Sequence, residues 1–95
     1  MPTHEEDTSF WRDFDHLNAV QKAEFKAAVA KFVVDLRRGT FRKGLRVKRV
    51  QGRPDTWEMT WADDGRALFT YGPSLRPGDP HVVSLRVGSH DIFDE

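Results

Sequence analysis

The stretch GSHDIF, residues 88–93, contains residue types that could transfer a proton near neutral pH. His90 follows a run of alternating apolar residues that is typical of a strand, and histidine is the side chain best suited to act as an acid or base in this pH range. Two interpretations are open. His90 is either a proton-transfer group at the end of a sheet, or part of a turn that buries Ile92 and Phe93.

Cationic side chains that could hold a phosphate lie in three other parts of the chain. Residues 37–53 contain eight Lys or Arg residues and no acid, a bias that suits phosphate binding although it is also typical of a solvated face. The predicted phosphate-binding residues are Arg46, Lys48, Arg49, Arg66 and Arg86. Arg66 could instead pair with Asp63 or Asp64 across a hairpin.

The predicted strands could bring several of these groups to one concave, basic surface. Its expected members are Lys48, Arg49, Arg66, Arg86 and His90. A histidine beside arginines is the minimum equipment for cleaving RNA without a metal, because a base must activate the 2′-hydroxyl and cations must stabilise the charge on the phosphorus centre. Tyr71 is expected to be half-buried structure, with a role as an acid near Arg66 as the alternative.

Two helices and four strands are predicted to position these residues. Phe10, Phe14 and Leu17 indicate a short helix over residues 9–17, with a strand as the alternative. A second helix begins at Asn18, with Gln21 completing a variant capping box, and ends at Gly39. The predicted strands lie within residues 45–51, 56–61, 66–72 and 81–87. The sequence ADDG, residues 62–65, predicts a hairpin.

This order of elements predicts an α+β domain in which two N-terminal helices pack on an antiparallel sheet of about four strands. The alternation in TWEMTW places Trp57, Met59 and Trp61 on one face, which we expect to be core. The opposite face then carries Glu58.

Composition limits the class of protein. The 95 residues form one predicted domain without cysteine, and no apolar run is long enough to span a bilayer, so we expect a cytoplasmic protein. Residues 1–8 are acidic and are expected to be flexible. The net charge is zero, which argues against binding nucleic acid through bulk charge alone. His4, His16 and His81 show no ligand spacing, so neither a metal nor another cofactor is predicted.

The basic LRVKRVQG, the strand WEMTW, ADDGRALFTYG and the terminal GSHDIF resemble, in this order, the RelE/ParE toxin superfamily of bacterial type II toxin–antitoxin systems. The resemblance covers about residues 20–93 and is greatest to the YafQ- and YoeB-like mRNA interferase branch. It implies a RelE-like domain over residues 1–95, with ribosome-dependent endonuclease activity on mRNA and silencing by a cognate antitoxin.

The resemblance also implies roles for individual residues. Arg66 matches the family arginine at the scissile phosphate, because DGRALFTY is similar to the strand that carries it. His90 matches the histidine of the terminal motif, and Phe93 matches the aromatic that follows. Lys48 and Arg49 fall in the family's basic strand, and Glu58 is a weaker candidate for an active-site group.

Two other functions remain open. One is a ParE-like toxin that inhibits DNA gyrase, a branch that generally lacks the histidine and arginine pair. The other is a non-catalytic member that only binds an antitoxin, for which the neutral charge is the main support. The family's usual N-terminal strand is not predicted in MPTHEEDT.

Overall fold

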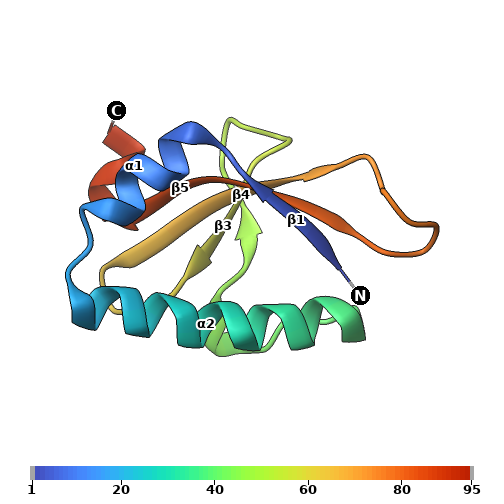
Figure 1. The fold of residues 1–95 in the computed structure, drawn as a ribbon, viewed down its shortest axis with the longest axis horizontal. Coiled ribbons are helices and arrows are strands. Elements are labelled where there is room, and N and C mark those ends of the chain that lie inside the picture. The colour runs from blue at the N-terminus through green and yellow to red at the C-terminus, as the bar shows by residue number, and fades with distance from the viewer. Residues whose placement is uncertain (1, 95) are drawn as a thin grey trace.

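The computed structural model describes residues 2–94, in which two helices and a five-stranded sheet form an α+β fold (Figure 1). The helices are α1 (Thr8–Asp15) and α2 (Ala19–Arg38). The strands are β1 (Thr3–Glu6), β2 (Lys48–Arg49), β3 (Trp57–Thr60), β4 (Gly65–Gly72) and β5 (His81–Ser89). Two 3-10 helices are η1 (Lys43–Leu45) and η2 (His90–Asp94). No helix in this range is long and apolar enough to cross a membrane.

The sheet is mixed, so the expected antiparallel sheet of four strands needs correction. The strand order is β1-β5-β4-β3-β2, and β1 runs parallel to β5 while the other neighbours are antiparallel. Thr3–Glu6 form β1, an N-terminal strand that the sequence did not predict. Because β1 is a polar edge strand whose four residues are exposed or only partly buried, it lacks the apolar alternation by which strands are recognised.

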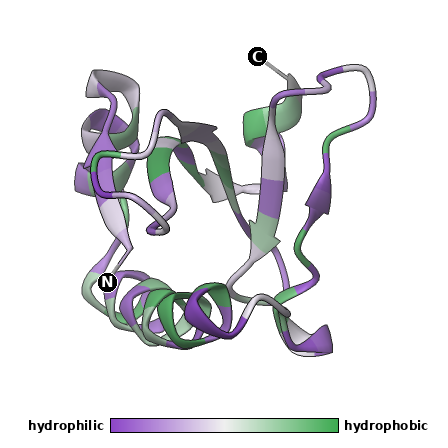
Figure 2. Cartoon of the chain, turned by 90° about the vertical axis from the view of Figure 1, so that its right-hand side faces the viewer, coloured by the Kyte–Doolittle hydropathy of each residue, from purple (hydrophilic) through white to green (hydrophobic). Residues whose placement is uncertain are grey.

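Helix α2 forms as the sequence predicts. The Asn18 side chain accepts a hydrogen bond from the backbone N–H of Gln21, the Gln21 side chain completes the capping box, and Gly39 ends the helix with a φ of 81°. The helix lies across one face of the sheet (Figure 1 and Figure 2). Its buried Phe25 and Phe32 pack against aromatic rings of the sheet, so the apolar stripe is the main contact between the two layers.

Helix α1 covers the part of β5 that β1 leaves unpaired. It begins at Asp7 rather than Ser9, because the Asp7 side chain accepts from the N–H of Thr8. The Ser9 hydroxyl instead donates to the carbonyl of Leu85, at 2.8 Å. An Asp13 oxygen accepts from the N–H of Val87, at 3.2 Å. Helix side chains therefore satisfy the edge of β5 where the short strand β1 has ended.

The sheet departs from the predicted strands in two places. Strand β2 spans only two residues, because the 3-10 helix η1 and a left-handed Arg46 (φ 48°) precede it. In β4 the alternation of buried and exposed residues is lost, because Leu68 is only 2% exposed and its neighbours Ala67 and Phe69 are buried as well. Trp61 and Met59 are buried as predicted, whereas Trp57 is half-buried.

Candidate functional site

The register between β4 and β5 brings Arg66 and His90 to the same end of the sheet. Arg66 pairs with Gly88, two residues before His90. The Cα atoms of Arg66 and His90 are therefore at most about 13 Å apart, from the spacing of paired strands and of consecutive residues. The two residues therefore lie near the same end of the sheet.

Arg66 is half-buried and is fixed by the hairpin that precedes it. Its Nη1 donates to the carbonyl oxygens of Ala62, Asp63 and Gly65, at 3.3, 3.2 and 2.9 Å. These are backbone contacts, not the carboxylate pairing across the hairpin that the sequence left open. Because a guanidinium has five N–H donors, the Nε and Nη2 donors lie outside these three bonds. The hairpin thus orients the side chain without using all of its donors.

The C-terminal turn both buries Ile92 and leaves His90 exposed, so the two interpretations of GSHDIF are compatible. Ile92 is 6% exposed and packs over Gly88, where a Cβ atom would lie 2.9 Å from its Cγ2. His90 is the first residue of η2 and lies on the surface, with its ring centroid 5.3 Å from that of the half-buried Phe93. The glycine lets the turn close tightly enough to present His90 beside β4.

Lys48 and Arg49 are adjacent in β2 and lie on opposite faces of the sheet. The Lys48 Nζ lies 3.4 Å from a Glu58 carboxylate oxygen, and these two residues are cross-strand partners. Arg49 is paired with Trp57, and its guanidinium lies over the Trp57 ring at 5.0 Å. The predicted single surface therefore does not include both cations.

Arg86 is held by helix α1 rather than presented to solvent. Its Nε and Nη2 bond the two carboxylate oxygens of Asp13, and the second of these distances is 3.2 Å. The half-buried pair joins α1 to β5, so the structure gives Arg86 a packing role and does not bring it beside Arg66 as an available cation. Arg46 is exposed, at the end of η1.

A carboxylate that the sequence analysis missed neutralises part of the basic stretch. The fully buried Asp35 accepts from the Arg42 backbone N–H and its Nε and Nη2, at 2.9, 2.8 and 2.9 Å, and Arg38 lies 3.8 Å away. The hydrogen bonds from Arg42 lower the pKa of Asp35 to about 2, and the same carboxylate raises the pKa of Arg42. The phosphate-binding capacity of residues 37–53 is therefore smaller than their charge indicates.

His81, for which no role as a metal ligand was predicted, joins β1 to β5. It is 4% exposed, its Nδ1 lies 2.7 Å from the Thr3 hydroxyl, and its Nε2 lies 3.0 Å from a Glu5 carboxylate oxygen. These contacts follow from the pairing of Thr3 with His81. Sequence spacing could not indicate them, because about eighty residues separate the partners.

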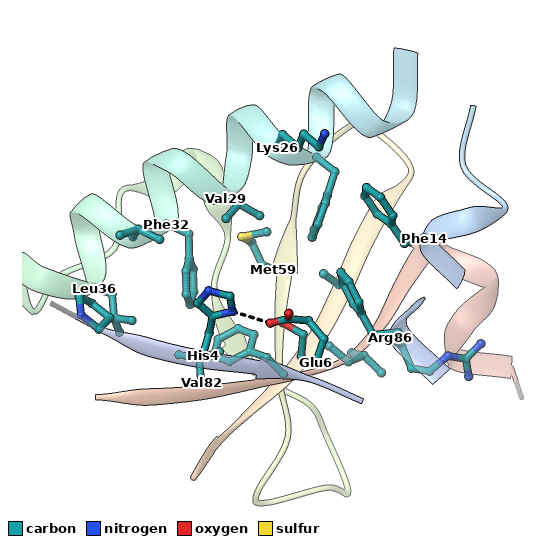
Figure 3. A pocket seen from close by; sticks show the side chains of 18 of the residues that line it. His4, Glu6, Phe14, Lys26, Val29, Phe32, Leu36, Met59, Val82 and Arg86 are labelled. Carbon is teal, nitrogen blue, oxygen red and sulfur yellow. Dashed lines mark hydrogen bonds and ion pairs between the residues drawn. The ribbon is translucent and has the colours of Figure 1, made fainter. Parts of the chain in front are cut away.

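An apolar groove of about 350 Å³ opens between α2 and the β1 side of the sheet (Figure 3). Phe32, Met59 and Val82 line its interior, and the His4–Glu6 pair and Lys26 lie at its polar edges. Strand β1, which forms one wall, is an edge strand whose outer side has no strand partner among residues 2–94. The groove is thus a concave surface that neither helix fills.

Neither protein-family models nor curated proteins match the sequence, whereas solved structures match it over nearly its full length. A chain of the E. coli DinJ–YafQ complex superimposes with a TM-score of 0.70 at 10% identity, covering 100% of both chains. The YoeB/ParE toxin from Agrobacterium tumefaciens gives 0.67 at 12% identity, over 93% of this chain and 98% of that one. A chain of the RelB–RelE antitoxin–toxin complex from Methanococcus jannaschii gives 0.61 at 14% identity, over 94% of each. This chain has the RelE/ParE toxin fold.

The match confirms the α+β, RelE-like fold that the order of motifs indicated, although the sheet is mixed and has five strands. The match to the DinJ–YafQ chain covers the whole of this chain and so includes the residues of β1. At these identities the match establishes the fold alone, so the roles of Arg66, His90 and Phe93 depend on the geometry of this chain.

Proposed function

We propose that this protein is the toxin of a toxin–antitoxin pair and acts as a metal-independent, ribosome-dependent mRNA endonuclease. One observation carries the proposal. Arg66 pairs with Gly88, two residues before the exposed His90, and this proximity, in a fold shared with the YafQ and RelE chains, supports a joint role for the two side chains.

The proposed chemistry is an attack by the RNA on its own backbone. A base removes the proton of a 2′-hydroxyl, and the 2′-oxygen bonds to the adjacent phosphorus. The bond from phosphorus to the 5′-oxygen of the next nucleotide breaks, and an acid protonates that oxygen. The RNA ends in a 2′,3′-cyclic phosphate, so this step consumes no water. One of the two proton transfers is assigned to His90.

Arg66 and Phe93 have supporting roles in this scheme. The Arg66 Nε and Nη2 donors would bind the non-bridging phosphate oxygens, where negative charge increases in the transition state. Phe93 lies against the His90 ring and would hold it toward the substrate. Arg46 and Lys48 are surface cations that could bind flanking phosphates, although Glu58 offsets the charge of Lys48.

His90→Gln is the decisive variant. Glutamine keeps hydrogen-bonding groups but cannot exchange a proton near pH 7, so we expect cleavage of ribosome-bound mRNA to fall by about two orders of magnitude or more. A thermal melt that matches the wild type would show that the fold survives. Wild-type cleavage by this variant would exclude His90 as the proton carrier.

The same protein preparation separates the other functions. Inhibition of gyrase supercoiling without mRNA cleavage would identify a ParE-like toxin. Antitoxin binding without either activity would identify a non-catalytic member. Either result would overturn the endonuclease proposal.

The proposed partner is a cognate antitoxin that covers the apolar groove or residues 37–53. An amphipathic segment could lay apolar side chains into the groove while acidic ones meet the exposed bases. Of the neighbours, DinJ–YafQ and RelB–RelE are toxin–antitoxin complexes. Charge reversal at Arg46 and Arg49 should weaken such a complex in a salt-dependent way. Unchanged affinity would exclude the basic stretch and leave the groove as the contact.

A further inference from the structure

Three planar groups from three adjacent strands contact one another in turn, Arg49 over the face of Trp57 and Trp57 edge-to-face with Tyr71. The guanidinium of Arg49, in β2, lies 5.0 Å from the ring centroid of Trp57, in β3. The Trp57 ring meets Tyr71, in β4, with centroids 6.0 Å apart and planes at 71°. We name Arg49, Trp57 and Tyr71 the stacking ladder.

The stacking ladder is accessible at both ends. Tyr71 is 40% exposed and Arg49 is exposed, whereas Trp57 between them is half-buried. The rings of Tyr71 and Phe69 also meet edge-to-face, with centroids 5.6 Å apart, and this contact helps to fix the Tyr71 ring. Partial burial raises the pKa of Tyr71, so its phenol remains neutral and can donate a hydrogen bond. A rigid π surface with a cation at one end is therefore open to solvent.

The ladder is separate from the proposed catalytic pair. Trp57 pairs with Phe69, whereas Arg66 pairs with Thr60, three positions further along β3. Because side chains alternate along a strand, Trp57 shares a face with the buried Met59, and Thr60 and Arg66 lie on the other face. A ligand on the ladder would thus lie about 10 Å from Arg66 along the strand direction and on the opposite face of the sheet.

Exposed aromatic rings flanked by cations are the usual platform for unpaired nucleobases, since every base offers a π face. Arg46 is exposed three residues before Arg49 in the sequence and could contact an adjoining phosphate. We propose that the stacking ladder binds an unpaired base of single-stranded RNA outside the nucleotides that are cleaved. This inference rests on the proposed function only in taking RNA as the ligand.

Binding can be measured apart from cleavage with a fluorescent 2′-O-methyl RNA of about eight nucleotides, a length within the range that single-strand sites cover. This oligomer lacks the attacking hydroxyl and is not cut. Tyr71→Ala should weaken binding about tenfold, the scale of losing one base stack. Tyr71→Phe keeps the ring and should bind within about twofold of the wild type.

Arg49→Lys tests whether the planar group matters beyond its charge. Lysine keeps the charge but cannot stack, so we expect binding to weaken several-fold. Arg53→Lys is the matched control in the same basic stretch, and it should leave affinity unchanged. An oligomer with abasic sites should bind the wild type more weakly than the intact oligomer does. The wild type and Tyr71→Ala should bind this abasic oligomer with equal affinity.

Three outcomes would overturn the inference: wild-type affinity of Tyr71→Ala, equal losses in Arg49→Lys and Arg53→Lys, or full binding of the abasic oligomer. His90→Gln should bind the 2′-O-methyl RNA normally, so loss of cleavage alone cannot be mistaken for loss of this site. If the wild type binds the oligomer through Tyr71 but cuts no mRNA, the proposed function fails and the stacking site stands. Binding of the variants to mRNA-free ribosomes distinguishes a ribosomal base from a messenger base.

Discussion

Replacement of Asp13 by alanine should destabilise the protein more than any other exchange of a helix α1 charge. Its carboxylate accepts three hydrogen bonds, from Nε and Nη2 of Arg86 and from the backbone N–H of Val87. The carboxylate and the guanidinium are 16% and 23% exposed, and Val87 is 1% exposed. Water therefore cannot fully replace the lost acceptor.

The magnitude follows from these contacts. A hydrogen bond to a charged group contributes about 1.5–3 kcal/mol, and a buried N–H left without an acceptor costs about 1–3 kcal/mol. Partial exposure of the Asp13–Arg86 pair reduces its share, so we expect a loss of about 3 kcal/mol in the free energy of unfolding. Asp13→Asn should recover about 1 kcal/mol, because its amide oxygen can still accept from Val87.

Urea unfolding followed by tryptophan fluorescence measures this loss, with an unchanged m-value showing that the same surface unfolds. Asp15→Ala, an exposed acid on the same helix, is the matched control and should change stability by less than about 0.5 kcal/mol. If Asp13→Ala loses no more than this control, the clamp between α1 and β5 does not stabilise the fold.

Three further outcomes are expected. Gly88→Ala should displace Ile92 and the turn that carries His90, because the new Cβ would lie 2.9 Å from the Ile92 Cγ2. We therefore expect mRNA cleavage to fall severalfold. Normal cleavage by this variant would contradict the tight packing. Because the pKa of Asp35 is lowered from 3.8 to about 2, its stabilisation is present above about pH 4 and disappears as the pH falls toward 2. Urea midpoints should show this loss in the wild type and a smaller one in Asp35→Asn. In the ribosome-containing assay, Arg66→Ala should reduce cleavage by about two to three orders of magnitude, and Arg66→Lys should restore only part of that activity. A fall in stability with intact cleavage would instead show that Arg66 has a structural role.

Patterns within one element were readable from the sequence. The limits of α2 followed from Asn18, Gln21 and Gly39, because a capping box and a left-handed glycine are local devices. The hairpin before Arg66 and the strand that ends at GSHDIF were equally local. The burial of Met59 and Trp61 followed from alternation along a single strand.

Contacts between distant elements were not readable. Asp35 lies seven residues before Arg42, beyond a helix end, and the bond between them depends on how the chain turns back. Asp13 and Arg86 are 73 residues apart, so neither residue indicates that the other neutralises it. The predicted basic surface was too large for this reason: a sequence gives the number of cations but not the partners that the fold supplies.

The position of β5 has a consequence for the order of folding. This last strand of the described chain lies between β1 and β4, so it is an inner strand of the sheet. Until it is synthesised, β1 has no parallel partner, His81 is missing from its contacts with Thr3, and α1 has no strand edge to cover. Such non-local pairing is slow to form and comes late. A nascent chain would therefore lack both a complete sheet and the residue His90 until β5 and the turn after it have been synthesised, which delays any activity of the proposed site until the whole domain can assemble.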